Sequence, residues 1–364
     1  MGRAFYTWLA AYEPHFRNRR SIADLAVIYP QSTIAFYKSG SGAGSWRGGD
    51  RGQTADYLQG LYYALLESRS FFDFVHEDDL SVERLAKYRS LLIPNAAYLA
   101  DTACEQIRQF AASGGSVLAT FETSRYTEWG DARPDFALGE LFGVHASGDV
   151  VGPVGNSYMR IEQRHPVTGG FEGTELLPGP ENRVPIRPWG KSELVLSVVP
   201  SYPAFPPEMV FPRTPRTDEP AAVFAENGKS RVAYFSGDID RTFWRSGNTD
   251  LGQVLENVLR WLRRETRPPV TVSGEGVVEL FAWETDPGYA LHIVNYTNPN
   301  MTRGFVRRFY EVGVQEVEFE VAEGKKIVRV RASRAGADLP FQQNGRLVSF
   351  QVPSVSDYEV IALT

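Results

Sequence analysis

The sequence predicts an α/β fold, a doubly wound parallel sheet with helices on both faces, followed by an antiparallel β-sandwich. Up to Leu262, short apolar runs alternate with stretches of helical periodicity, as they do in strand–helix–strand units. After a linker at Arg267-Pro-Pro269, apolar and polar residues alternate and no helical pattern follows. The chain of 364 residues is long enough for two such domains.

The first half of the chain supplies the alternating elements of the expected parallel sheet. Strands are expected over residues 24–29, 71–75, 90–93 and 116–121. One helix is expected over 54–69, and a second from Asp101, as its cap, to Gly114. Strands that alternate with helices in this way run parallel and are covered on both faces.

The remaining expected elements are a hairpin, a closing helix and the strands of the sandwich. Asn227-Gly228 predicts a tight turn between strands 221–225 and 231–235, and an apolar face over 251–262 predicts a helix. Between these and the first half, a short helix ending at Phe142 and a strand at 158–161 are expected. The sandwich strands are expected over 277–283, 290–295, 315–321, 326–330, 347–352 and 358–363.

Composition limits the partners and the compartment. Lys+Arg 38 against Asp+Glu 44 gives a net charge of −6, which argues against nucleic acid as a partner. The single cysteine, Cys104, excludes an intramolecular disulfide and suits a reducing compartment, so we expect a cytoplasmic protein. No stretch approaches the roughly 20 apolar residues of a membrane helix, and the N-terminus lacks the apolar core of a signal peptide. No membrane partner is expected.

Two features that resemble chemical sites have simpler interpretations. Cys104 shares a helical face with Ile107 and Ala111, so we expect a buried packing thiol. The run His76-Glu-Asp-Asp79 has the residue types of a metal site, but adjacent side chains point in different directions, which favours a capping loop. The other histidines are scattered. We therefore expect no metal and no other cofactor.

Two loops that follow strands of the expected sheet carry the candidate site, because ligands of such sheets bind beyond the carboxyl ends of the strands. They are Glu122–Asp131 and Gly237–Trp244. The candidate ligand or interface residues are Glu122, Tyr126, Trp129, Asp238, Asp240, Arg241 and Trp244. Carboxylates, arginine and tryptophan together suit either a sugar or a subunit contact, and we favour a subunit contact or packing of the loops themselves over a sugar site. No catalytic residue is assigned, since adjacency of Asp238 and Asp240 does not establish the separation that glycosidase acids need.

Several motifs in order along the chain resemble the β-galactosidase trimerisation domain. They are Ala26-Val-Ile-Tyr29, Phe72-Asp-Phe-Val-His-Glu-Asp-Asp-Leu80, Leu92-Ile-Pro-Asn-Ala96 and Phe121-Glu-Thr. The resemblance implies a flavodoxin-like fold of the class I glutamine amidotransferase type. The nucleophilic cysteine of those amidotransferases is missing, because the chain reads Phe121-Glu-Thr-Ser-Arg125 at the corresponding turn.

Later motifs extend the resemblance to the C-terminal part of bacterial glycoside hydrolases similar to the α-L-fucosidase family once called hypothetical glycosyl hydrolase 6. They are Gly228–Phe235, Gly237-Asp-Ile-Asp-Arg241 and His292-Ile-Val-Asn-Tyr-Thr297. In that family a (β/α)8 barrel carries the catalytic carboxylates, and there is no room for one before Asp24. The expected domains are a linker helix leaving the barrel (1–20), a trimerisation domain (21–266) and a β-sandwich (267–364). A fragment, a split gene and a stand-alone relative all remain open.

Three functions are consistent with these residues. The first is a non-catalytic assembly module, a homotrimer that serves a glycoside hydrolase active site on another domain or chain. The second is carbohydrate binding through aromatic side chains on the loops or at Trp283 and Tyr296, although Trp283 alternates with Phe281 in a strand and core packing is favoured for it. The third is an independent hydrolase that uses Glu122, Asp238 or Asp240.

Overall fold

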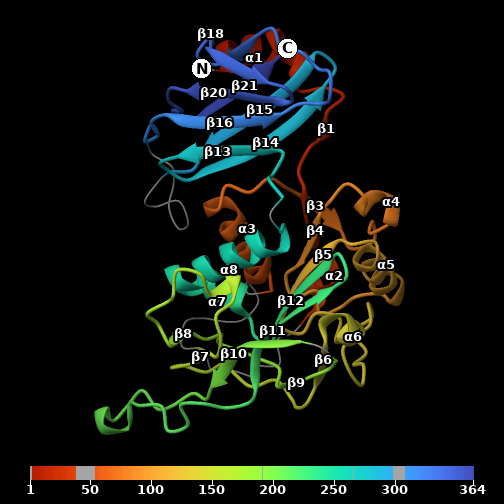
Figure 1. Ribbon diagram of the computed structural model, residues 1–364, viewed down its shortest axis with the longest axis vertical. Helices are drawn as coiled ribbons and strands as arrows, with labels where there is room; N and C mark the ends of the chain where they lie inside the picture. The colour runs from red at the N-terminus through yellow and green to blue at the C-terminus, as the bar shows by residue number, and fades with distance from the viewer. Residues whose placement is uncertain (1, 38–53, 191, 265, 298–307) are drawn as a thin grey trace. The chain divides into compact units, whose positions relative to one another are not determined.

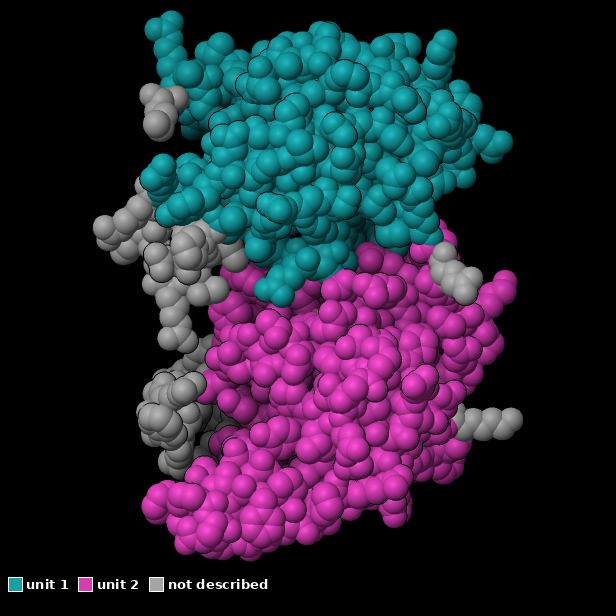
Figure 2. Space-filling view, turned by 60° about the vertical axis from the view of Figure 1, so that its left-hand side comes forward, with its two compact units in different colours: residues 1–24, 65–73, 267–364 teal, residues 25–64, 74–266 magenta. Residues whose placement is uncertain are grey.

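The computed structural model describes residues 2–37, 54–190, 192–264, 266–297 and 308–364 (Figure 1). The chain divides into two compact units, which Figure 2 shows in different colours. Unit 1 comprises residues 1–24, 65–73 and 267–364, and unit 2 comprises residues 25–64 and 74–266. Both units are therefore assembled from stretches that are far apart in the sequence.

Unit 2 is built on a nine-stranded sheet with the strand order β3-β2-β4-β5-β12-β11-β10-β7-β8. The strands are β2 (Leu25–Tyr29), β3 (Phe72–His76), β4 (Ser90–Ile93), β5 (Ser116–Thr120), β7 (Tyr158–Ile161), β8 (Leu176–Pro178), β10 (Glu193–Val199), β11 (Pro220–Asn227) and β12 (Ser230–Phe235). A separate antiparallel pair joins β6 (Val144–Ala146) to β9 (Ile186–Pro188).

The sheet is mixed, so the expected parallel sheet accounts for only part of it. Strands β2, β4, β5 and β12 run parallel to one another. Strands β11, β10, β7 and β8 pair antiparallel. The hairpin between β11 and β12 forms as the sequence predicts, but Asn227 still pairs with Ser230, so the turn is Gly228-Lys229, one residue later than Asn227-Gly228. Gly228 has a φ of +60°, as such a turn requires. The strands that follow β11 in the sheet are β10, β7 and β8. No helical crossover of the kind that parallel pairs need joins these strands in the described chain, and they pair antiparallel.

Helices cover both faces of the parallel strands. The helices of unit 2 are α2 (Gln31–Phe36), α3 (Asp56–Glu67), α4 (Val82–Leu85), α5 (Asp101–Ala112), α6 (Gly139–Phe142), α7 (Ile239–Ser246) and α8 (Thr249–Leu262), with short 3-10 turns η3 (Pro166–Thr168) and η4 (Pro207–Met209). Val117 and Ala119 of β5 share a core with α5 and α6, whereas α8 packs against β5 and β12 separately. No helix in the described part of the chain is long and apolar enough to cross a membrane.

Asp101 does not cap α5, contrary to the prediction. The cap position is Ala100, which offers no side-chain hydrogen bond, and Asp101 is the first helical residue. The Asp101 carboxylate instead forms an ion pair with Arg133. An acid in the first turn still interacts favourably with the helix dipole.

Unit 1 consists of two antiparallel sheets that share one core. The six-stranded sheet contains β1 (Arg20–Ser21), β14 (Val278–Thr285), β15 (Gly288–Asn295), β21 (Tyr358–Leu363), β17 (Val330–Ala332) and β18 (Ala337–Asp338). The four-stranded sheet contains β13 (Val270–Gly274), β16 (Gln315–Glu320), β20 (Leu347–Val352) and β19 (Phe341–Asn344). Alternate residues of both sheets are buried in the common core. The strand expected over 326–330 begins only at Val330.

The aromatic N-terminal segment packs on the six-stranded sheet. It comprises α1 (Gly2–Ala11) and η1 (Glu13–His15). The ring centres of Trp8 and Tyr358 are 6.2 Å apart, those of Phe16 and His292 are 5.2 Å apart, and Arg331 Nε donates to the Tyr12 hydroxyl at 3.1 Å. The segment therefore covers the face of this sheet that points away from the core.

Trp283 lies on that same outer face, so the expectation of core packing for it is wrong. Ala282 and Leu280 are the buried residues of β14, and Trp283 and Phe281 alternate with them and stack on each other. The guanidinium of Arg19 lies 4.5 Å from the centre of the Trp283 ring. The predicted period-2 alternation is present in β14, but alternation alone does not indicate which of the two faces points into the core.

We predict that Gly60, where α3 lies against α7, cannot be replaced by a residue that has a side chain. A Cβ on Gly60 would lie 1.9 Å from the carbonyl oxygen of Asp240, which is backbone and has no freedom to move aside. Gly60→Ala should therefore lower the free energy of unfolding by about 3 kcal/mol. Urea denaturation followed by circular dichroism measures the change. Gly173→Ala, which adds a Cβ in open space, is the control and should leave stability nearly unchanged.

Candidate functional site

The two candidate loops leave the same edge of the sheet in unit 2. Strands β5 and β12 are parallel neighbours, with Thr120 opposite Phe235, so the segments after them begin side by side. The first continues through Phe121 and Glu122, and the second through Asp238 into α7. This edge is where ligands of α/β sheets bind.

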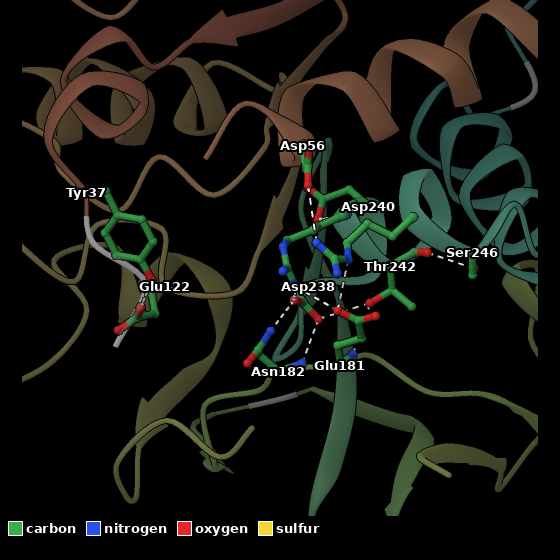
Figure 3. A network of polar contacts seen from close by, with 11 residues as sticks. Tyr37, Asp56, Glu122, Glu181, Asn182, Asp238, Asp240, Thr242 and Ser246 are labelled. Carbon is green, nitrogen blue, oxygen red and sulfur yellow. Dashed lines mark hydrogen bonds and ion pairs between the residues drawn. The ribbon is translucent and has the colours of Figure 1, made fainter. Parts of the chain in front are cut away.

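Asp238 is the centre of a buried polar network (Figure 3). Its Oδ2 accepts hydrogen bonds from Arg241 at 2.9 Å and from Asn182 Nδ2 at 2.7 Å. Its Oδ1 accepts from the Asn182 backbone N–H at 2.8 Å and from the Thr242 hydroxyl at 3.1 Å. Burial raises the pKa of Asp238, and the neighbouring Arg241 opposes that rise. A buried carboxylate is retained only when it is paired and hydrogen-bonded in this way.

The network extends through two further acids to α3. Glu181 accepts from Arg241 at 3.0 Å and forms an ion pair with Arg245 at 3.2 Å. Arg245 also lies 3.7 Å from Asp56, at the start of α3, and Trp244 donates a hydrogen bond to Asp56. Two arginines and three carboxylates therefore connect α7, α3 and the segment before β9.

Asp240 points away from the ion pairs and into the sheet. Thr120 donates to its Oδ2 at 2.8 Å, and the Arg241 backbone N–H donates to its Oδ1 at 2.9 Å. The side chain is fully buried, and burial raises its pKa to about 7. The hydrogen bonds from Thr120 and from the Arg241 N–H oppose this rise in pKa, and the negative charge of Asp238 adds to it.

Glu122 forms a second cluster with tyrosines, drawn to the left of the Asp238 group in Figure 3. Tyr37 and Tyr126 donate to its two carboxylate oxygens, Tyr126 at 3.0 Å. Burial raises the pKa of Glu122, and these two hydroxyl donors oppose the rise. The clusters are joined through Asn95, whose Oδ1 accepts from the Glu122 N–H at 3.1 Å and whose own N–H donates to Thr120 at 3.0 Å.

Two of the buried polar atoms beside these clusters have no hydrogen-bond partner among the residues that the structure describes. They are the Tyr57 hydroxyl and Asn95 Nδ2. The Tyr57 ring stacks on Phe121 with the ring centres 6.0 Å apart, and it lies beneath the Arg241 guanidinium. An unsatisfied buried hydroxyl costs free energy that an apolar ring of the same shape does not.

The turn after β5 has a strained backbone. Phe121 has a φ of +53°, a conformation that is a true outlier for a bulky residue. Asn95, after β4, and Ser124 also have positive φ. The turn thus has a constrained geometry where the sequence carries no nucleophile, and its first side chain is a buried phenyl ring.

The structure brings six of the seven candidate residues into these two clusters. Asp238, Asp240, Arg241 and Trp244 lie in the first, and Glu122 and Tyr126 in the second. Trp129 joins neither, because it is 84% exposed on the loop after β5. Sequence reasoning missed the partners of these residues, which lie on other elements; Thr120, for example, is 120 residues from Asp240. The missed partners are Tyr37, Asp56, Asn95, Thr120, Glu181 and Asn182.

The remaining sequence candidates have structural roles. Cys104 is buried in the core as predicted, and burial raises its pKa to about 11. In the acidic run, His76 contacts Gln31 at 2.7 Å and Glu77 accepts from the Ser32 backbone N–H at 2.7 Å. Their partners differ, so the run does not converge on one point. The helix that follows, α4, is capped by Ser81.

Comparison with solved structures finds glycoside hydrolases that share the fold. α-L-Fucosidase isoenzyme 2 from Paenibacillus thiaminolyticus matches with a TM-score of 0.67 and 19% identity, over 98% of this chain and 51% of its own. β-Galactosidase from Bacillus circulans sp. alkalophilus matches with a TM-score of 0.67 and 14% identity, over 98% of this chain and 44% of its own. The chain has the fold of part of a glycoside hydrolase.

A third match is the β-galactosidase from Rahnella sp. R3, with a TM-score of 0.61 and 14% identity, over 98% of this chain and 43% of that enzyme. The chain thus spans about half the length of the enzymes it matches. No family model matches the sequence, and no curated protein matches it. At these identities the likeness concerns the fold, and function has to be argued from the residues.

The isolated Asp240 carboxyl predicts a pH-dependent stability. The folded chain binds a proton at Asp240 up to about pH 7, whereas the unfolded carboxyl has a pKa of 3.8. The unfolded state therefore holds fewer protons between these values, and the free energy of unfolding decreases as the pH rises through about 7. Asn in this position keeps an acceptor for the Arg241 N–H and donates to Thr120.

The free energy of unfolding of Asp240→Asn minus that of the wild type should increase by about 2–3 kcal/mol when the pH is raised from 5 to 8.5. Denaturant titrations at both pH values measure it. Asp131→Asn, at an exposed acid, is the control and should show no such change. An Asp240→Asn difference that does not depend on pH would contradict the assignment.

The two buried tyrosines should respond differently to loss of the hydroxyl. Tyr57→Phe removes an unpartnered group and should leave the free energy of unfolding unchanged or slightly higher. Tyr37→Phe removes a donor to the buried Glu122 and should cost about 1–3 kcal/mol. Thermal unfolding of both variants tests this pair, and equal losses would show that the two hydroxyls are equivalent.

Proposed function

We propose that this chain is a non-catalytic assembly region of a glycoside hydrolase that acts in carbohydrate metabolism. The observation that carries the proposal is the match over 98% of this chain to about half of a fucosidase and of a β-galactosidase. In the proposal, the catalytic carboxylates belong to a (β/α)8 barrel on another domain or chain. The aromatic segment at residues 1–20 corresponds to the part that leaves that barrel.

The burial of the candidate acids supports a non-catalytic role. Asp238 and Asp240 are fully buried, and Glu122 is nearly so. A glycosidase needs two carboxyl groups that face a sugar from opposite sides, with one of them free to donate a proton. Here the lone pairs of Asp238 are used by four donors from the protein itself.

The strand order supports assignment of unit 2 to the flavodoxin-like fold of amidotransferase-like domains. Numbered along the chain, the strands β3-β2-β4-β5-β12 have the order 2-1-3-4-5, which is that of flavodoxin. The order reverses between β2 and β4. Tyr37 and Asn95 follow these two strands, so the Glu122 cluster lies at the switch point of the proposed fold.

We further propose that the chain forms a homotrimer in the cytoplasm and that Trp129 lies in the contact between subunits. Trp129 is the most exposed large hydrophobic residue of the described chain, at 84%, and tryptophan is enriched among the residues that dominate interface energies. It follows the polar cluster of Glu122 and Tyr126, which fixes the base of its loop.

Light scattering of the purified chain tests the assembly. We expect a mass near three times 40.7 kDa, with no turnover of chromogenic fucosides or galactosides. Trp129→Ala should lower the mass at a concentration where the wild type is associated, whereas Trp189→Ala, at a half-exposed tryptophan outside the candidate loops, should not. A monomer that cleaves a glycoside would overturn the proposal.

A further inference from the structure

The aromatic N-terminal segment of unit 1 is held loosely on the sheet that it covers. No residue of α1 or η1 is fully buried. A cavity of about 750 Å³ lies beside α1, lined by Phe5 and Trp8 of the helix and by Arg334 and Tyr358 of the sandwich, among others. The segment is therefore packed less tightly than a core helix, which is typical of parts of a protein that open locally.

Three buried nitrogen atoms at this contact have no hydrogen-bond partner among the described residues. They are Trp8 Nε1, His15 Nδ1 and His292 Nε2. The first two belong to the segment, and His292 belongs to β15, where it alternates with the core residues Leu291 and Ile293 and so faces outward. Each unpartnered nitrogen weakens the attachment, because water would satisfy it if the segment moved away.

His292 is buried in mostly apolar surroundings beneath the segment. The Phe16 ring lies nearly perpendicular to the imidazole, with the ring centres 5.2 Å apart. Its partners in register on the neighbouring strands are Phe281 of β14 and Val360 of β21. Its Nδ1 lies 2.5 Å from the Tyr358 hydroxyl, which leaves Nε2 without a partner. A neutral imidazole is tolerated here, whereas an imidazolium would be a buried charge with an unpaired N–H.

The groups around His292 oppose a positive charge on it. Burial lowers the pKa of His292 to about 4, and the positive charges of Arg19 and His15, both in the segment that begins with α1, contribute to the lowering. The other charged or titratable groups near it on this side of the sheet are Tyr358 of β21, Arg334 in the turn after β17 and Glu279 of β14. Glu279 does not contribute to the pKa shift of His292. A proton on His292 is therefore accommodated only when the imidazole reaches water.

We propose that the N-terminal segment is a pH-sensitive cap, and that α1 and η1 leave the outer face of the six-stranded sheet when His292 gains a proton. The proton comes from water, and no covalent bond of the chain breaks. Release lets water solvate the imidazolium and exposes Val360, which is buried beside His292 on that face. The inference concerns unit 1 alone and does not depend on the assembly role proposed above.

The direction of the pH effect follows from the protons bound in each state. The pKa of His292 is about 4 with the segment attached, whereas the ordinary value of a histidine is 6.5. The attached state binds fewer protons between these values, so acid favours release. Each pH unit from 6.5 down to 4 lowers the ratio of attached to released segment about tenfold, which is about 300-fold in all. His15, whose pKa is also lowered by burial, adds to the effect in the same direction.

Fluorine NMR of the full chain labelled with 5-fluorotryptophan tests the proposal. Trp8 reports on the segment, and Trp261, which is buried in unit 2, reports on the rest of the fold. Trp8→Phe and Trp261→Phe assign the two signals. Between pH 7 and pH 4 we expect the Trp8 signal to move to the position of a solvent-exposed ring while the Trp261 signal stays unchanged.

His292→Gln keeps a neutral side chain at every pH and should move the midpoint of the Trp8 change lower by about one pH unit or more, since only His15 then titrates. His292→Phe, which fills the site with a ring, is a second variant with the same expected result. His165→Gln is the matched control, because His165 is a partly buried histidine of unit 2 whose pKa is also lowered by burial. The Trp8 signal of this control should respond to pH as it does in the wild type.

Three results would overturn the proposal: a Trp8 signal that stays in place down to pH 4, Trp8 and Trp261 signals that change together, or a midpoint that neither His292 variant moves. A further measurement needs only the wild type. The imidazole C2 proton signal of His292 should titrate over the same pH range as the Trp8 change. Titration of His292 in a different range would also refute the cap.

Discussion

The ion pair between Asp238 and Arg241 is the interaction on which the arrangement of unit 2 depends. Removing both charges from water is expensive, and the cost is offset only when every lone pair and N–H group finds a partner. Those partners come from the Asn182 segment, from Thr242 of α7 and, through Glu181 and Arg245, from Asp56 of α3. The contact of Gly60 with the Asp240 carbonyl brings α3 near enough to complete the network. The charged side chains at the carboxyl edge of the sheet therefore each have partners within the protein.

The fold was predictable where the information is local. The apolar runs of β2, β4 and β5 and the apolar faces of α5 and α8 can be recognised within single short segments. The hairpin of β11 and β12 is likewise signalled by residues 227–228, next to its turn. Strand direction beyond β11 was not predictable, because it depends on pairing between segments that are distant in sequence. The face of β14 that points into the core was not predictable for the same reason. Alternation is visible in the sequence, but the covering of Trp283 by residues near position 19 is not.

The candidate site was predictable in its acids and arginine and unpredictable in its partners. A loop after a parallel strand is a physical argument for position, and it places Glu122, Asp238 and Arg241 correctly at one edge. It cannot supply Thr120 for Asp240 or Tyr37 for Glu122, because each of these contacts joins separate elements. Nor does it reveal burial. The carboxylates that sequence reasoning treats as available to a ligand are occupied by the protein itself, and Trp129 alone among the candidates stays on the surface.

The backbone of Phe121 limits how this sheet edge can evolve. A bulky residue with positive φ costs about 1–3 kcal/mol, and such a conformation persists only where the surroundings prevent relaxation. Glycine would relieve the cost at once but would remove the ring that stacks on Tyr57. Two requirements therefore conflict at this position: an unstrained backbone favours glycine, whereas a filled core favours an aromatic ring. The observed phenylalanine satisfies the second. A lineage that acquired a reactive side chain here would gain chemistry only by giving up an aromatic ring from its core.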